Sequence, residues 1–144
     1  MSMLKYTRSL SRAIFTPKKQ KIFGLFDARI ANPKLPLKWT FMCGHDTEIY
    51  PLMTLFNISS SRCLEELYRS NRTDALNCEP GPEFAASLIF ELHREEDNTY
   101  SVMIRYNGKY VYLCEQRQTK CEYEEFKRRV TQDFIDVAEL CGKT

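Results

Sequence analysis

The sequence predicts an α/β fold whose elements are, in order, a helix, a buried strand, a helix, a long loop, a three-stranded antiparallel meander and a C-terminal helix. Three observations predict this fold class. Residues 37–43 form a nearly continuous apolar run, residues 84–113 alternate in hydrophobicity around Asn107-Gly108, and residues 122–140 carry an apolar stripe at helical spacing. A chain of 144 residues with 43% hydrophobic residues is long enough for one modest core.

The first predicted helix covers residues 22–30 and is ended by the two prolines that follow it. Residues 37–43 come next. Because this run is apolar on both faces as it approaches Gly44, we expect a central strand that is buried on both sides. A lone buried strand needs parallel neighbours, and no other segment of the chain clearly supplies them. The sequence therefore resembles the second part of a larger α/β domain.

The second helix is predicted to begin at Asp46 or Thr47, because both are good capping residues. Pro51 then falls in the first turn or just beyond it, where few backbone hydrogen bonds are lost. The apolar side chains expected on its buried face are Ile49, Leu52, Met53 and Phe56. Residues 63–68 predict a further helical turn. The polar run 69–82, with two prolines and a glycine, predicts a long surface loop.

Three strands are predicted within residues 84–92, 99–106 and 109–113. A polar run over 95–98 forms the first turn. The second turn is Asn107-Gly108, a strong hairpin signal because a type I′ turn needs positive φ at both central positions. The last helix is predicted over residues 122–140. Its apolar stripe consists of Tyr123, Phe126, Val130, Phe134, Val137 and Cys141.

The net charge of +2 hides an uneven distribution along the chain. Six basic residues precede Asp27, the first acidic one, and the rest of the chain holds 15 basic and 19 acidic residues. This mildly acidic body argues against nucleic-acid binding. Residues 1–21 are expected to be a basic, disordered leader, and its composition fits an organelle transit peptide and a solvated leader alike. It lacks the apolar run of a secretory signal, and no run approaches the roughly 20 apolar residues of a membrane span.

Six cysteines form an even number in a short chain, which raises the question of redox compartment. Cys63 with Cys78, and Cys114 with Cys121, each bracket a polar stretch, so two local disulfides are our first interpretation. Free thiols come second and a zinc site third, because the paired close spacing of structural zinc sites is missing. The triplets Asn57-Ile58-Ser59 and Asn71-Arg72-Thr73 are glycosylation sequons and agree with secretion, unlike the leader. The compartment stays open.

The motif Gly44-His45-Asp46-Thr47 lies between the predicted buried strand and the second helix. This arrangement brings an imidazole and a carboxyl group together at a helix N-terminus, where the backbone carries partial positive charge. Such a place suits a phosphate group. The simpler interpretation is a strand-end histidine followed by an ordinary helix cap, and the residues alone favour it.

These residues resemble those of the histidine acid phosphatases, in the branch that also holds phytases with a His-Asp signature. The likeness rests on Phe41-Met42-Cys43-Gly44-His45-Asp46-Thr47 with Pro51-Leu52, on residues 81–92, and on Tyr106-Asn107-Gly108-Lys109. Cys114 and residues 121–126 resemble that family's closing cysteine pair and last helix. The resemblance covers residues 22–142, which predicts that residues 22–144 are the carboxy-terminal portion of such a domain.

The resemblance implies a phosphoglycerate-mutase-like fold, with a mainly parallel sheet and helices on both faces. It also implies hydrolysis of phosphate monoesters at acidic pH, in a secretory, lysosomal or extracellular setting, without metal or cofactor. His45 would contact the phosphoryl oxygens and Asp46 would protonate the leaving oxygen. The family's nucleophile lies in an Arg-His-Gly motif that has no counterpart in this sequence.

This departure leads us to expect that the chain is inactive alone and needs a separate amino-terminal segment of the same fold. The expected ligand is a phosphate monoester or inorganic phosphate. An alternative is a non-catalytic remnant that acts as a protein-interaction or phosphate-binding module.

Overall fold

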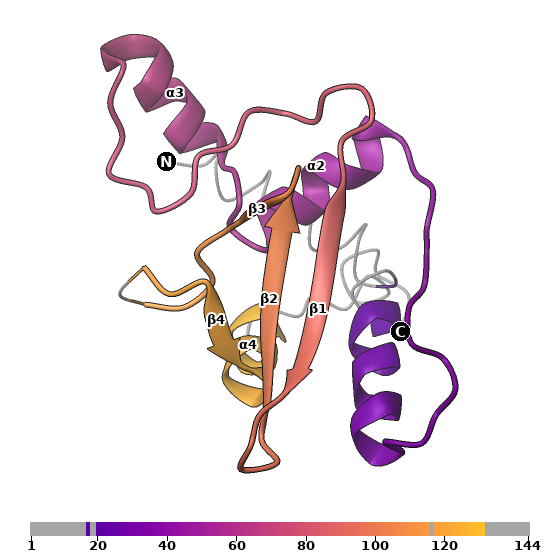
Figure 1. Ribbon diagram of the computed structural model, residues 1–144. Coiled ribbons are helices and arrows are strands. Elements are labelled where there is room, and N and C mark those ends of the chain that lie inside the picture. The colour runs from indigo at the N-terminus through magenta and orange to yellow at the C-terminus, as the bar shows by residue number, and fades with distance from the viewer. Residues whose placement is uncertain (1–16, 18–19, 116, 132–144) are drawn as a thin grey trace, which may run out of the picture.

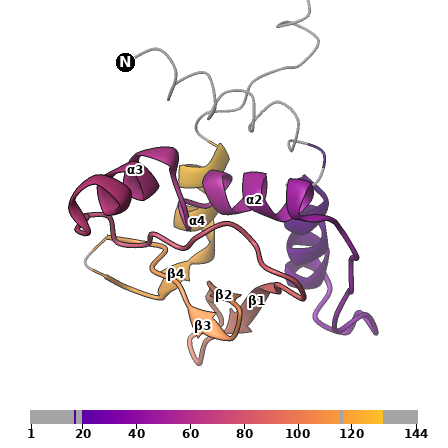
Figure 2. The ribbon, with the colours of Figure 1, turned by 90° about the horizontal axis from the view of Figure 1, so that it is seen from above.

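The computed structural model describes residues 17, 20–115 and 117–131. In this part of the chain, four helices accompany a four-stranded antiparallel sheet (Figure 1). Figure 2 shows α2 and α4 on one side of the sheet, with the helix of residues 20–31 beside strand β1. The mixed helix and sheet composition confirms the predicted fold class and is consistent with part of a phosphoglycerate-mutase-like domain. No described helix is long and apolar enough to cross a membrane.

The predicted helices are present with somewhat wider or shifted ends. The first covers residues 20–31, α2 covers Asp46–Leu55, α3 covers Ser61–Ser70 and α4 covers Tyr123–Thr131. The turn predicted at 63–68 extends to a full helix because the Ser60 hydroxyl accepts a hydrogen bond from the backbone N–H of Cys63 at 3.1 Å. The second half of the helix predicted over 122–140, with Phe134, Val137 and Cys141, lies outside the described residues, as does most of the predicted leader 1–21.

The sheet is built around β2, Tyr100–Tyr106. One edge pairs with β1, Leu88–Arg94, in a register that sets Leu88 opposite Tyr106. The other edge pairs with the two-residue β3, Lys109–Tyr110, and with β4, Lys120–Glu122. The turn between β2 and β3 has φ of 47° at Asn107 and 82° at Gly108, which confirms the predicted hairpin.

The third strand is shorter than predicted because a side chain takes over its pairing. The amide group of Asn77 accepts from the Tyr112 N–H at 2.8 Å and donates to the Tyr112 carbonyl at 2.7 Å. The first strand begins at Leu88 rather than at residue 84, since Ala85 has a positive φ of 60° and Phe84 is fully exposed. Positive φ interrupts an extended backbone.

The short strand β4 was not predicted from the sequence. Its three residues pair with Ser101, Val102 and Met103 of β2 and lead directly into α4. Glu122, predicted as the first helical residue, is instead the last residue of β4. Its carboxylate accepts hydrogen bonds from the N–H groups of Glu124 at 3.0 Å and Glu125 at 2.8 Å, and so caps the helix.

The prediction of a central buried strand over residues 37–43 is wrong for this structure. The segment 37–45 carries no strand assignment and is exposed along its length, with Trp39 78% and Phe41 77% exposed. In Figure 1 it runs outside the sheet, between the helix of residues 20–31 and α2. The physical reason is the absence of neighbouring parallel strands among the described residues, which leaves the segment nothing to pair with.

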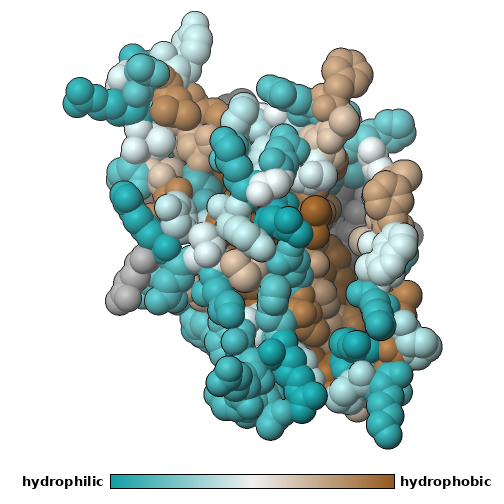
Figure 3. Space-filling model, viewed as in Figure 1, coloured by the Kyte–Doolittle hydropathy of each residue, from teal (hydrophilic) through white to brown (hydrophobic). Residues whose placement is uncertain are grey.

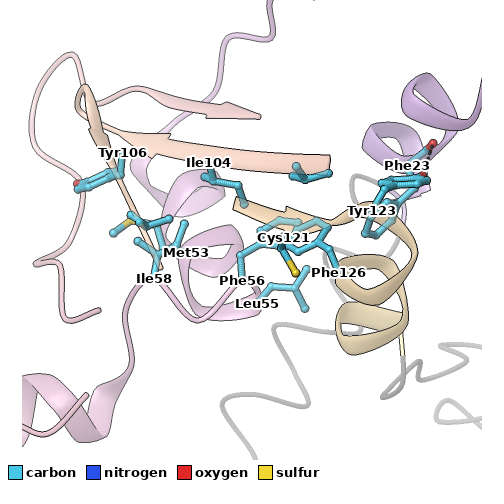
Figure 4. Close-up of a cluster of buried hydrophobic side chains, with 12 residues drawn as sticks. Phe23, Met53, Leu55, Phe56, Ile58, Ile104, Tyr106, Cys121, Tyr123 and Phe126 are labelled. Carbon is cyan, nitrogen blue, oxygen red and sulfur yellow. Dashed lines mark hydrogen bonds between the residues drawn. The ribbon is translucent and has the colours of Figure 1, made fainter. Parts of the chain in front are cut away.

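The core lies between the sheet and the helices (Figure 4). Phe56, at the end of α2, stacks on Phe126 of α4 at a centroid distance of 5.7 Å and meets Phe90 of β1 edge-on at 4.9 Å. Met53, Ile58, Val102 and Ile104 are completely buried around them. This cluster fixes the position of α2, and therefore of its N-terminus.

Both predicted disulfides are present. Cys63 is joined to Cys78 with 5.7 Å between their Cα atoms, and Cys114 is joined to Cys121 with 5.6 Å. The first bridge ties α3 to the long loop, and the second ties the segment after β3 to β4. Cys43 is a free, exposed thiol. A buried Cys43, as the strand prediction required, is therefore also wrong.

Candidate functional site

The two predicted site residues lie at the start of α2. His45 is the N-cap, with extended backbone angles of φ −92° and ψ 170°, and Asp46 is the first helical residue. The carbonyl of His45 accepts hydrogen bonds from the N–H groups of Glu48 at 2.9 Å and Ile49 at 3.2 Å. These bonds begin the helix and hold the His45-Asp46 pair at its positive end.

Two carboxylates already bond to the backbone N–H groups at this helix end. Asp46 Oδ1 accepts from the Thr47 N–H at 2.8 Å, and Glu48 Oε2 accepts from the His45 N–H at 3.3 Å. Acidic groups in the first turn are stabilised by the helix dipole. An additional anion at this end therefore meets two acidic side chains, and protonation of a carboxyl group would reduce the repulsion.

Gly44 makes room for one of these contacts. A Cβ atom at position 44 would lie 2.3 Å from Glu48 Oε2, so any larger residue would displace the end of the Glu48 side chain. The glycine of the Gly44-His45-Asp46-Thr47 motif thus permits Glu48 to fold back over the N-terminus of α2.

Pro51 lies inside α2, where it supplies no N–H to the carbonyl of Thr47 one turn earlier. The side chain of Thr54 donates to the carbonyl of Tyr50 at 3.2 Å, a different carbonyl from the one that Pro51 deprives of a donor. The helix continues for its 10 residues despite the proline. Its apolar side holds Met53 and Leu55 in the core, which leaves the N-terminal turn facing outward.

The candidate site is exposed in this structure. His45, Asp46 and Thr47 all have exposed side chains, and the segment that precedes them carries exposed Leu37 and Met42 besides its two aromatic residues. Figure 3 shows hydrophobic side chains at the surface beside β1, on the side of the helix of residues 20–31. His45 and Asp46 lie at the exposed start of α2, and the described residues place no arginine clamp or second histidine against them.

The second histidine belongs to a different cluster on the outer face of the sheet. His93 Nε2 lies 3.0 Å from Glu91 Oε2, Arg105 forms an ion pair with the same carboxylate, and the Tyr110 hydroxyl donates to it at 3.3 Å. Partial burial raises the pKa of Glu91, but the bonds from His93 and Arg105 outweigh it and leave this pKa below its ordinary value. This cross-strand network was not foreseen, because it depends on the register of β1 and β2.

The described residues hold no group of three or more metal-ligating side chains. A shallow depression of about 320 Å³ is lined by Cys114, Glu115, Gln118, Glu122, Glu125 and Arg129. It lies at the β4–α4 end of the molecule and includes neither His45 nor Asp46. Its charged groups pair with one another, since Arg129 contacts both Glu115 and Glu125.

Comparison with known proteins identifies the family. The family model for the histidine phosphatase superfamily (branch 2) matches residues 5–107, which is more than half of the chain and includes the His45-Asp46 motif and its flanking elements. No curated protein and no solved structure shows significant similarity to the chain. On the evidence of the family match, the chain belongs to branch 2 of the histidine phosphatase superfamily.

Proposed function

We propose that this chain carries the phosphate-contacting and proton-donating part of an acid phosphatase site, and that the nucleophile comes from a separate segment. The observation that carries the proposal is the His45-Asp46 pair at the N-terminus of α2 in a member of this superfamily. In this proposal His45 contacts the phosphoryl oxygens and Asp46 donates a proton to the leaving oxygen. The substrate class is phosphate monoesters.

The chemistry of ester cleavage supports these two roles. An alkoxide leaves phosphorus poorly unless it is protonated, so a positioned carboxylic acid accelerates the step by roughly 10² to 10⁴. An imidazolium and the backbone dipole of α2 stabilise negative charge on the phosphoryl oxygens. Acidic pH favours the protonated carboxyl group and lowers the repulsion between phosphate and the two acidic residues of the first turn, Asp46 and Glu48.

The sequence indicates what such a site lacks. Neither of its two histidines, His45 and His93, follows an arginine, so the 144 residues contain no Arg-His-Gly motif. Covalent catalysis needs an attacking group and a clamp that orients the phosphate. The nucleophilic histidine and its arginines must then come from outside these residues.

The exposed segment 37–43 supports completion by another segment. It is largely apolar, exposed and unpaired with any described strand, and it leads directly into the His45-Asp46 motif. A strand added alongside it would bury Trp39 and Phe41 and satisfy its backbone N–H and C=O groups. The same event would place groups from the added segment next to His45.

The test compares the chain alone with the chain mixed with an amino-terminal segment that contains Arg-His-Gly. The readout is hydrolysis of an aryl phosphate at acidic pH. We expect turnover only in the mixture, with a decrease of roughly 10² to 10⁴ in kcat for Asp46→Asn. The matched control is Asp74→Asn, which changes an exposed aspartate of the long loop and should leave kcat unchanged.

One result would contradict the incomplete-site proposal directly. Robust turnover by the chain alone, abolished by Asp46→Asn and insensitive to any added segment, would mean that another residue of this chain attacks phosphorus. A second histidine variant, His93→Ala, would then show whether the cluster on the outer face of the sheet provides that group.

A second candidate function is a non-catalytic module that binds phosphate or a protein partner. The exposed apolar segment 37–43 favours it, because such a surface is suited to a protein partner whether or not catalysis follows. If no mixture turns over, binding of inorganic phosphate that is lost in His45→Ala but kept in His93→Ala would identify a phosphate-binding module. Absence of phosphate binding in both would leave the protein-interaction role.

A further inference from the structure

We propose that Asn71 carries an N-linked glycan. Asn71-Arg72-Thr73 is an acceptor sequon, and it lies directly after α3, in the long loop that leads to β1. Figures 1 and 2 show α3 projecting from the rest of the molecule, away from the sheet. This proposal does not depend on the phosphatase chemistry proposed above.

The local geometry leaves the Asn71 side chain available. Its backbone is left-handed, with φ 53°, and its N–H caps α3 by donating to the carbonyl of Leu67 at 2.8 Å. The side chain is exposed, and its amide group has no hydrogen bond to any described residue. The conformation of Asn71 is therefore held by the backbone, and a sugar on its amide nitrogen would displace no contact of the fold.

A neighbouring aromatic ring is consistent with a covering group at this place. Tyr68, three residues before Asn71, is 93% exposed, more than any other large hydrophobic residue near α3. Sugar rings present an apolar face of C–H bonds, and aromatic rings bury large apolar area when such a surface is nearby. A glycan on Asn71 would cover part of this ring.

The other sequon is a poorer acceptor in this fold. Asn57 itself is exposed, but Ile58 is completely buried and Ser59 is 1% exposed. The Ser59 hydroxyl donates to the carbonyl of Glu79 at 2.6 Å, inside the packed region that follows α2. Folding therefore buries the last two residues of this triplet, whereas Asn71 and Arg72 are exposed and Thr73, whose hydroxyl donates to Glu66, is half-buried.

The disulfides indicate a cellular compartment in which N-glycans are also attached. The Cys63–Cys78 bridge spans 15 residues and encloses Asn71, and the Cys114–Cys121 bridge is also present. Disulfides form in the oxidising secretory compartments, where N-glycans are also transferred. The Cys63–Cys78 disulfide and a glycan on Asn71 would thus both form in the secretory pathway.

The donor of the glycan in this reaction is an oligosaccharide linked to a polyprenyl diphosphate. The Asn71 amide nitrogen forms a bond to the first carbon of the sugar, and the bond between that carbon and the diphosphate oxygen breaks. The amide nitrogen loses one proton, and the polyprenyl diphosphate leaves with the bonding electron pair. No oxidant or reductant is needed.

The test uses the full chain, directed into the secretory pathway of eukaryotic cells by an added signal peptide. After reduction, cleavage after glutamate releases residues 67–83, which contain Asn71, because the bond between Glu79 and Pro80 resists cleavage. Treatment with peptide-N-glycosidase in water labelled with heavy oxygen converts a glycosylated asparagine to labelled aspartate, which mass spectrometry locates. We expect the label at Asn71 and a faster-migrating protein after the treatment.

Two variants separate glycosylation from structural effects. Thr73→Ala should abolish the label, whereas Thr73→Ser keeps the sequon and the hydroxyl that donates to Glu66 at 2.8 Å, and should retain it. Asn98 also has a positive φ but lies in no sequon, and it serves as an unlabelled internal control. Secreted, disulfide-bonded chain with no label at Asn71 would overturn the proposal, and so would a label that persists in Thr73→Ala.

Discussion

The hydroxyl of Tyr123 donates a hydrogen bond to Oδ1 of Asp27 at 2.6 Å, although 96 residues separate the two in the chain. Lys127 completes the contact, since its Nζ lies 2.8 Å from both oxygens of the same carboxylate. Tyr123 is buried, and its ring packs against Phe23 and Phe26. The first helix is thereby fixed to α4 by both polar and apolar contacts.

Replacing Tyr123 with phenylalanine tests the polar part of this contact. Tyr123→Phe keeps the ring in the core and removes a hydrogen bond to a charged group, so the free energy of unfolding should fall by about 1 to 2 kcal/mol. The matched control is Tyr110→Phe, whose exposed hydroxyl lies 3.3 Å from Glu91, with an expected change below about 0.5 kcal/mol. Urea unfolding measures both. Equal losses in the two variants would show that the buried bond adds nothing.

The same contact predicts a pH dependence of stability. Partial burial raises the pKa of Asp27, but the hydrogen bonds from Lys127 and Tyr123 outweigh it and leave the pKa below its ordinary value of 3.8. Because the unfolded chain then binds this proton more readily, the contribution is fully present above the ordinary value and is lost as the pH falls through the folded-state pKa.

Asp27→Asn isolates this contribution. The difference in unfolding free energy between the natural chain and the variant should be constant above pH 3.8 and should shrink as the pH falls further. Added salt should reduce the difference at every pH, because the Asp27 side chain is 46% exposed and the ion pair with Lys127 is partly screened. A difference that stays constant down to the lowest pH measured would exclude the proposed linkage.

Local signals in the sequence predicted most of this fold correctly. Asn107-Gly108 specifies its turn through the backbone conformation that these two residues tolerate, so the register of β2 and β3 follows from neighbours in sequence. The N-terminus of α2 at Asp46 was predictable for the same reason, because helix caps are short-range interactions.

Features that depend on distant parts of the chain were missed. Asn77 shortens the third strand through hydrogen bonds to Tyr112, 35 residues away, and nothing in the local pattern of either segment indicates this. The run 37–43 has the composition of a buried strand, but burial requires neighbouring strands that the described residues do not provide. For the candidate site, adjacency of His45 and Asp46 follows from sequence, whereas the groups that would enclose them do not.

The disulfides predict a specific pattern of thiol protection. In the native, unreduced protein, alkylation should label Cys43 and should leave Cys114 and Cys121 unlabelled, because these two are bridged. Cys63 and Cys78 should also be protected. Peptide mapping by mass spectrometry measures the labels, and alkylation of both Cys114 and Cys121 would dismiss their bridge.

Reduction should also lower stability. The Cys63–Cys78 bridge closes a loop with a sequence separation of 15, for which chain entropy gives about 3 kcal/mol, and the Cys114–Cys121 loop of 7 gives slightly less. Replacing each pair with serines measures the two contributions separately in urea. A larger loss for the shorter loop would indicate that native contacts, rather than loop closure, determine the effect.

Two glycines should respond to alanine with opposite signs. Gly108 has φ of 82° in the hairpin turn, a conformation that costs an alanine roughly 1 kcal/mol, so Gly108→Ala should destabilise the protein. Gly24 lies exposed within the helix of residues 20–31, and a Cβ atom there meets nothing within 4 Å. Gly24→Ala should therefore raise the free energy of unfolding by up to about 1 kcal/mol. Urea midpoints at unchanged slope measure both, and a shift of the same sign in the two variants would contradict the assigned backbone conformations.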